Sequence, residues 1–129
     1  MAGKYALDTN TVIRLFAGDQ AVLDWVTGVS ELYVPCIVLG ELYYGAQKFA
    51  NVDANTAKII ELSSRVKILP CNAETARHYG RIKKSLRTKG KPIPENDIWI
   101  GSIIMQHNLS LVTSDTHFKE IEGMKLTEI

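Results

Sequence analysis

Four acidic side chains occupy positions where carboxylate chemistry is feasible. Asp8 follows a short apolar segment, Asp115 follows the segment LSLVT, and Asp97 begins the apolar stretch NDIWIGSIIMQH. Glu41 lies among apolar neighbours in CIVLGELYYGAQKF. Carboxylates held close together without counter-ions repel one another, and a divalent cation removes that conflict. Because all-oxygen ligands favour Mg²⁺ or Mn²⁺ over zinc, we interpret the four acids as candidate ligands of such an ion.

Each acid also has an ordinary structural interpretation. Asp8 and Asp97 could cap helices. Asn96 and Glu95 beside Asp97 are competing candidates for the cap and the helix-dipole charge. Asp115 could begin a turn or cap a short helix. Glu41 could reach solvent along a polar stripe, or be buried with a partner. The case for a metal site therefore rests on the combination of acids.

Other reactive residue types lack a comparable pattern. His78, His107 and His117 do not pair by spacing, and we expect surface or capping roles for them. Cys36 and Cys71 form no CxxC motif, so we expect reduced, partly buried thiols. The sequence has neither a GxSxG elbow nor a glycine-rich phosphate loop. Hydrolysis by a metal-activated water is the chemistry that remains.

Short predicted strands alternate with helices along the chain. The predicted strands are 4–7, 32–34, 67–69, 109–113 and 124–128; the predicted helices are 9–17, 20–28, 36–49, 52–65, 73–89 and 96–107, with a turn at 89–95 and a helical turn at 116–120. This alternation favours a three-layer α/β/α sandwich with a mostly parallel central sheet. Sites in such sheets lie outside the carboxyl ends of the strands, where Asp8 and Asp115 fall.

Length and composition are those of an ordinary globular domain. With 129 residues, 46% of them hydrophobic and 22% charged, we expect a single domain over residues 1–129. No apolar run approaches the ~18 residues of a membrane span, and the N-terminus lacks the apolar core of a signal peptide. We therefore expect a cytoplasmic protein that does not enter a membrane.

Positive charge is concentrated in one segment, although the formal net charge is only +1. Seven of the 15 Lys and Arg residues lie between Arg77 and Lys91, with no acid among them. Such a helix face is commonly just solvated, with Ala76, Tyr79, Ile82 and Leu86 as its buried stripe. Beside an acidic metal site, however, it would suit a phosphodiester substrate. The candidate RNA-binding residues are Arg81, Lys83, Lys84 and Arg87.

Four motifs together resemble the PIN-domain family, specifically the VapC-type toxins of bacterial and archaeal toxin–antitoxin pairs. They are LDTN near the N-terminus, GELYYGA, ENDIWIGSI and LVTSDTHFKEIEGMKL near the C-terminus. Their order and separation carry the resemblance over essentially the whole chain. Two departures are Ile100–Ser102, where an Ala-rich run is common, and Asp115, where many relatives carry Asn.

This resemblance implies a metal-dependent endoribonuclease. Asp8, Glu41, Asp97 and Asp115 then correspond to the acidic site, and Thr113 to the hydroxyl residue that supports it. Family members bind Mg²⁺ or Mn²⁺, form homodimers and are inhibited by an antitoxin whose C-terminal segment enters the acidic groove. Under this hypothesis Asp8, Asp97 and Asp115 hold one or two metal ions, and Glu41 ligates or orients the attacking water.

Two other functions remain open at this point. The sequence DTNT at residues 8–11 resembles the DxDxT loop of haloacid-dehalogenase-type phosphatases, but Asn10 stands where that family needs a general acid. A non-catalytic RNA- or protein-binding module would use the same acids to receive a basic partner. A binding module would be indifferent to a chelator, whereas the nuclease would not.

Overall fold

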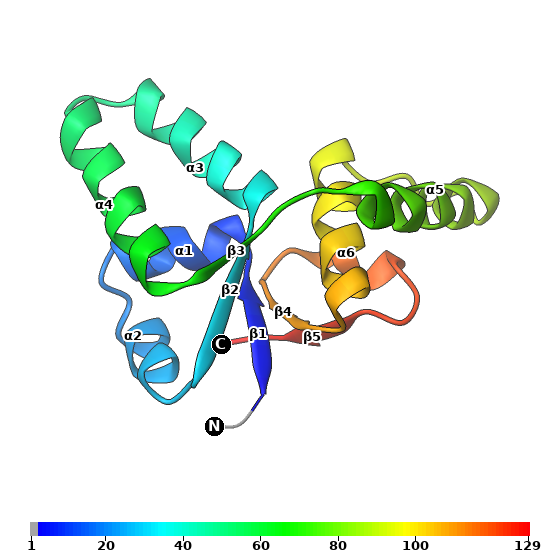
Figure 1. Ribbon diagram of the computed structural model, residues 1–129, viewed down its shortest axis with the longest axis horizontal. Coiled ribbons are helices and arrows are strands. Elements are labelled where there is room, and N and C mark those ends of the chain that lie inside the picture. Colours follow the sequence, from blue (N-terminus) through cyan, green and yellow to red (C-terminus); the bar gives the residue numbers. More distant parts are fainter. Residues whose placement is uncertain (1–2) are drawn as a thin grey trace.

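A computed structural model describes residues 3–129, which form six α-helices, a short 3₁₀ helix (η1) and five strands (Figure 1). The strands are β1 (Lys4–Leu7), β2 (Glu31–Pro35), β3 (Lys67–Leu69), β4 (Ser110–Val112) and β5 (Lys125–Thr127). The helices are α1 (Thr9–Phe16), α2 (Gln20–Thr27), α3 (Cys36–Lys48), α4 (Val52–Arg65), α5 (Ala73–Thr88), α6 (Glu95–His107) and η1 (Thr116–Glu120).

The five strands form one sheet in the order β3-β2-β1-β4-β5, and every pairing is parallel. The chain first winds from β1 through β2 to β3, and then returns across the sheet to place β4 on the other side of β1. The direction of winding therefore reverses between β1 and β4. Open α/β sheets carry their ligand sites at such a reversal, outside the carboxyl ends of the strands.

Helices cover both faces of the sheet. Figure 1 shows α1, α2, α3 and α4 on one side and α5 with α6 on the other. The predicted three-layer α/β/α architecture is confirmed, with a sheet that is wholly rather than mostly parallel. Across residues 3–129 no helix has both the length and the apolar character needed to cross a membrane.

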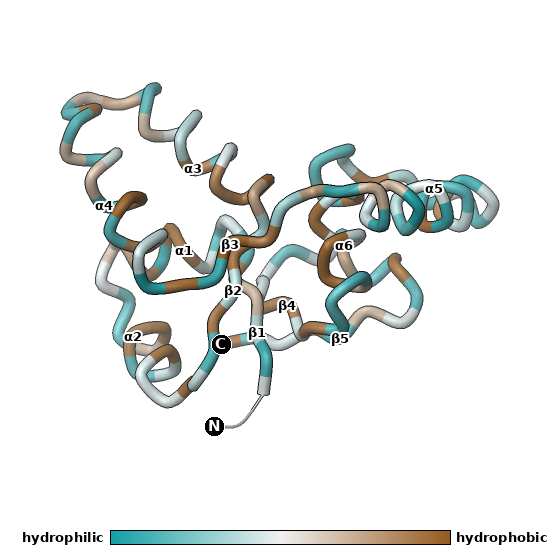
Figure 2. The backbone as a smooth tube through the Cα atoms, in the orientation of Figure 1, coloured by the Kyte–Doolittle hydropathy of each residue, from teal (hydrophilic) through white to brown (hydrophobic). Residues whose placement is uncertain are grey.

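The core lies along the central strands and helix α6. Ala6 and Leu7 of β1 and Leu111 of β4 are fully buried, as are Ile100 and Ile103 of α6. In Figure 2 the middle of the α6 tube is largely brown and its ends are teal, whereas the α5 tube is mainly teal. Helix α6 is therefore held by burial of apolar surface on most of its sides, and α5 presents much of its surface to water.

Helix boundaries match the predicted ones to within one or two residues, with two informative differences. Helix α6 begins at Glu95, and Pro94 occupies the cap position without a side-chain hydrogen bond. Asp97 thus lies inside the first turn, and its interpretation as a cap is wrong. The predicted buried stripe of α5 is also wrong at Ala76, which is exposed, because the buried position is Thr75, whose hydroxyl bonds Asn72 and Gln106.

The glycine in the Ile100–Ser102 segment has a packing role. A Cβ at Gly101 would lie 2.6 Å from Cδ1 of Ile121, so this position of α6 brings the segment after η1 close to the helix. Ser102 is buried as well, and its hydroxyl donates to the carbonyl of Ile98 at 2.6 Å. The small residue at position 101 therefore allows α6 to pack closely against the segment that follows η1.

Candidate metal centre

The carboxyl ends of β1 and β4 are joined through Asp8 and Thr113. Leu7 is paired with Val112, and the backbone N–H of Asp8 donates to the Val112 carbonyl at 3.1 Å. Thr113 Oγ1 then donates to Asp8 Oδ2 at 2.6 Å, while the N–H of Thr9 donates to Asp8 Oδ1 at 2.8 Å. The carboxylate of Asp8, a residue only 4% exposed, is thereby fixed in orientation at the point where the winding reverses.

A small polar network extends this link to Asp115. The Asn10 amide lies 3.3 Å from both Asp8 Oδ2 and Thr113 Oγ1, and its oxygen accepts from the N–H of Ser114. Thr113 Oγ1 also accepts from the N–H of Asp115 at 3.0 Å. One hydroxyl group therefore couples the position of Asp8 to the backbone that carries Asp115.

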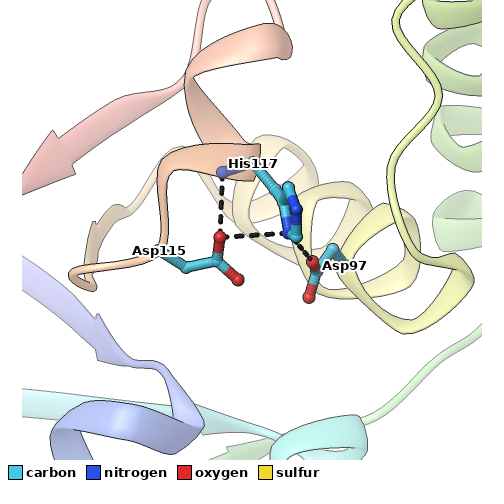
Figure 3. Close-up of side chains that lie close together, drawn as sticks. All are labelled: Asp97, Asp115 and His117. Atoms are coloured by element: carbon cyan, nitrogen blue, oxygen red, sulfur yellow. Dashed lines mark hydrogen bonds and ion pairs between the residues drawn. The ribbon is translucent and has the colours of Figure 1, made fainter.

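Asp97, Asp115 and His117 form the tightest group of ligand-type atoms (Figure 3). His117 Nδ1 lies 3.1 Å from Asp97 Oδ2 and 3.1 Å from Asp115 Oδ1. Asp115 caps η1, since its carboxylate also accepts from the N–H of His117 at 2.9 Å. Within residues 3–129, this is the set of acidic, His or Cys side chains whose ligand atoms all lie within 4.8 Å of one another.

Glu41 enters from the opposite helical layer. It is half-buried on α3, and its Oε1 accepts a hydrogen bond from Thr9 Oγ1 at 2.8 Å. Asp8 caps α1 and bonds Thr113, and Thr9, the first residue of α1, bonds Glu41. Glu41 therefore combines the two alternatives: it is partly exposed, and it has a hydrogen-bond partner that lies beside Asp8.

Electrostatic repulsion links all four predicted acids. Burial is the main cause that raises the pKa of Asp8, with further contributions from the charges of Glu41 and Asp115. Burial, followed by the charge of Asp115, raises the pKa of Asp97 to about 6. The hydrogen bond to Asp97 and the charge of Asp115 raise the pKa of His117. Every acid of the group is therefore within electrostatic reach of at least one other.

These residues fit a divalent cation. Across the described chain, no Lys or Arg forms an ion pair with any of the four acids, and the imidazole of His117, which is charged only when protonated, is the basic side chain in contact with them. Carboxylate oxygens that converge without basic partners have the chemistry that Mg²⁺ or Mn²⁺ requires. An imidazole beside them is more compatible with Mn²⁺ than with Mg²⁺.

Comparisons with known proteins agree with this geometry. The PIN domain family profile matches residues 5–124. The chain is 36% identical to "Ribonuclease VapC2" of Haemophilus influenzae over 114 residues, which are 87% of this chain and 86% of that protein. It is 29% identical to the "tRNA(fMet)-specific endonuclease VapC" of Shigella flexneri, with 95% of each chain covered. The chain belongs to the PIN-domain family, within the VapC ribonucleases.

A solved relative has nearly the same backbone. The structure of VapBC2 from Rickettsia felis bound to a DNA fragment superposes with a TM-score of 0.90 at 27% identity, covering 98% of each chain. The predicted family and fold are thus confirmed for the whole described chain.

The residue that sequence reasoning missed in this PIN domain is His117. It was expected on a surface turn, and it is half exposed, but its ring contacts two of the predicted acids. No local sequence pattern signals this contact, because it arises only when η1 turns the ring back toward Asp97 and Asp115. The structure brings Asp97 and Asp115 together directly, and it places Asp8 and Glu41 outside the 4.8 Å group.

The predicted RNA-binding residues all lie on α5 but have different surroundings. Lys83 and Arg87 line a cavity of about 340 Å³ between α5 and the loop before α6, whereas Arg81 lines a different cavity beside η1. Lys84 is exposed on the helix. Lys83 is already engaged, since its Nζ lies 3.0 Å from Tyr79 Oη and 3.3 Å from Glu95 Oε1. Its positive charge is therefore partly neutralised beside the N-terminus of α6.

Proposed function

We propose that this chain is a Mg²⁺- or Mn²⁺-dependent endoribonuclease and the toxin of a toxin–antitoxin pair. The single observation that carries the proposal is that Asp8, Asp97 and Asp115 lie where the sheet reverses its winding and repel one another, while no Lys or Arg of the described chain forms an ion pair with them. Membership of the VapC ribonucleases gives this acidic site its substrate class.

Each residue has a role that follows from its contacts. Asp97 and Asp115 would hold the cation, with His117 as a neighbouring ligand or counter-charge. Asp8 would hold it directly or through water, fixed in place by Thr113. Glu41, oriented by Thr9, would accept a proton from the attacking water. When bound, the cation would polarise the scissile phosphate and activate that water.

The basic residues of α5 would hold the RNA backbone. Arg81, Lys84 and Arg87 are exposed, and the described chain gives them no ion pair. Arg87 lines the cavity that also includes Glu95 and Ile98, on either side of Asp97 in the sequence. Cations along this flank could attract a phosphodiester chain toward the acids. Lys83 would contribute less, because Glu95 already pairs with it.

An antitoxin segment has a groove in which to lie. A cavity of about 330 Å³ between α1, α3 and α4 is lined mainly by apolar residues, with Glu41, Asn55 and Lys58 as its polar side chains. Ile13 and Phe49 at this groove are 56% and 68% exposed, which is unusual for large apolar side chains. The similar VapBC structures contain a VapC chain together with its VapB partner. An amphipathic antitoxin segment in this groove would reach the acids at its Glu41 end.

RNA cleavage by antitoxin-free protein tests the nuclease. The substrates are a mixed pool of structured and single-stranded RNAs and initiator tRNA, chosen because the Shigella relative is named for it. We expect cutting with Mg²⁺ or Mn²⁺, none in EDTA, and loss of cutting in Asp97→Asn. Asp53→Asn, an exposed acid on α4, is the matched control and should cut normally.

Two outcomes would contradict the proposal. Cutting that persists in EDTA would exclude a metal-dependent site. Tight RNA binding without cutting by wild-type protein, equal with metal and with chelator, would favour the non-catalytic binding module. Homodimer formation, implied by the family resemblance, and a cytoplasmic location, expected from the sequence, stay predictions; light scattering of the purified protein tests the first, and cell fractionation the second.

A further inference from the structure

The two cysteines of the chain lie side by side although 35 positions separate them. Cys36 is the first residue of α3, and Cys71 follows β3 by two positions. Because β2 and β3 pair in parallel register, with Pro35 opposite Leu69, the segments that leave the two strands start together. Figure 1 shows the connection from β3 to α5 running past the beginning of α3. The Cys36 and Cys71 sulfur atoms are 4.0 Å apart.

We propose that Cys36 and Cys71 form a reversible disulfide when the protein meets a disulfide oxidant. Their sulfur atoms must approach by about 2 Å to reach the bond length of about 2.05 Å, and the parallel register of β2 and β3 already holds the two segments side by side. Cys71 is exposed, so a soluble oxidant can reach it. The inference does not depend on the proposed nuclease function.

The reaction balances with a small-molecule disulfide, such as oxidised glutathione, as the oxidant. The thiolate of one cysteine attacks a sulfur of the oxidant and releases one glutathione thiolate, leaving a mixed disulfide on the protein. The second cysteine thiolate attacks the protein sulfur of that mixed disulfide and releases the second glutathione. Two electrons pass to the oxidant, and the two protons of the cysteine thiols go to the released thiolates.

Cys71 is held in the thiol form. Desolvation, followed by the adjacent Cys36, raises the pKa of Cys71 to about 11. Few Cys71 thiolates therefore exist at neutral pH, and thiolates are the attacking species. Cross-linking should consequently be slow at pH 7 and faster at alkaline pH.

The bond would connect the two helical layers. Cys36 begins the helix that carries Glu41, and Cys71 precedes the helix that carries the basic residues. Cross-linking residues so far apart in sequence restricts the unfolded chain and stabilises the fold. We expect the melting temperature to rise by about 10 °C for a loop of this length in a domain of this size.

Thiol counting across glutathione buffers, from reducing to oxidising, tests the proposal on the full chain. After alkylation and intact-mass measurement, the wild type should pass from two alkylated cysteines to none in one step, at the mass of a single chain, with the expected rise in melting temperature. Cys36→Ser and Cys71→Ser should each keep one cysteine that is alkylated or carries a single glutathione, with no rise.

Three results would overturn the inference. They are two thiols that stay free in folded protein under the most oxidising buffer, a mixed glutathione adduct that never resolves, and a cross-link between two chains. Circular dichroism of each sample verifies folding, and denatured protein in the same buffers verifies that the oxidant is active.

Discussion

The hydroxyl of Thr113 donates to Asp8 at 2.6 Å and accepts from the backbone N–H of Asp115 at 3.0 Å. One side chain at the end of β4 thus fixes the acid at the end of β1 and the loop that carries another acid. Groups that orient metal ligands in this way commonly change metal affinity or activity about 10–100-fold when removed.

Replacing Thr113 with Val tests this relationship. We expect metal-dependent RNA cleavage to fall about 10–100-fold, and the free energy of unfolding to fall by about 2 kcal/mol because a buried charged acceptor loses its donor. Thr113→Ser keeps the hydroxyl and should retain most activity. Equal activity of the Val and Ser variants in a cleavage assay would mean that the hydroxyl does not position Asp8.

The metal-free protein should lose stability from Asp97 as pH rises from about 4 to about 6. The pKa of this carboxyl is raised from 3.8 to about 6 in the fold, so the folded state binds a proton that the unfolded state has released. Stability therefore declines as pH passes through that window. His117, with its pKa raised above 6.5, acts in the same direction above that pH.

Chemical denaturation of wild type and Asp97→Asn at several pH values measures this effect. The difference isolates Asp97 from acids with lowered pKa values, such as Asp19 and Glu31, which act in the opposite direction. We expect the variant to gain about 2 kcal/mol relative to wild type between pH 4 and pH 7. A constant difference across that range would contradict the raised pKa.

Metal affinity should depend on pH in the opposite direction, increasing as pH rises. The cation requires the ionised form of Asp97, so a proton competes with it below the pKa of about 6. We expect the affinity for Mn²⁺ or Mg²⁺, measured by calorimetry, to fall about tenfold for each pH unit below 6 and to level off above it. Affinity that does not change between pH 5 and pH 7 would remove Asp97 from the ligand set.

His117 should distinguish the two candidate ions. An imidazole ligand suits Mn²⁺ better than Mg²⁺, and His117 Nδ1 already faces Asp97 and Asp115. We expect His117→Ala to weaken Mn²⁺ binding by about tenfold and Mg²⁺ binding by less. His107→Ala, an exposed residue at the end of α6, is the control. Tighter binding of both ions in His117→Ala would instead make His117 a competing counter-charge.

Much of this fold could be predicted because each strand carries its own local signal. The apolar segment that ends at Leu7 and the segment that ends at Val112 predicted two strands, and each strand end is followed by a polar site residue. Parallel strands share one carboxyl edge, so residues that follow the strands are expected to lie close together. This expectation needs only the positions of the strand ends.

The remaining features depended on contacts that are distant in sequence. Asp97 looked like a cap because its helix start was ambiguous by one residue, and Pro94 decided it. His117 and the Cys36–Cys71 contact arise only when η1 turns back and when β2 and β3 align, and no local pattern encodes either event. Lys83 was correctly placed on α5, but its pairing with Glu95 could not be read from charge spacing alone.

The pairing of Lys83 with Glu95 distinguishes this lysine from the other cations of α5 that are expected to contact RNA. Charge reversal of Lys84 or Arg87 should weaken RNA binding about tenfold and flatten its dependence on salt by about one unit of slope, because a phosphate contact and its released counter-ion are lost. Lys83→Glu should have a smaller effect on the salt slope, since Glu95 already neutralises that lysine.

Binding is measured in the Asp97→Asn background, so that cleavage does not interfere. Lys48→Glu, at the end of α3 and outside the basic segment, makes the same change of charge and should leave the slope close to that of the parent. If Lys84→Glu and Arg87→Glu matched Lys48→Glu in both affinity and slope, α5 would be a solvated helix and the RNA would approach the acids from another side.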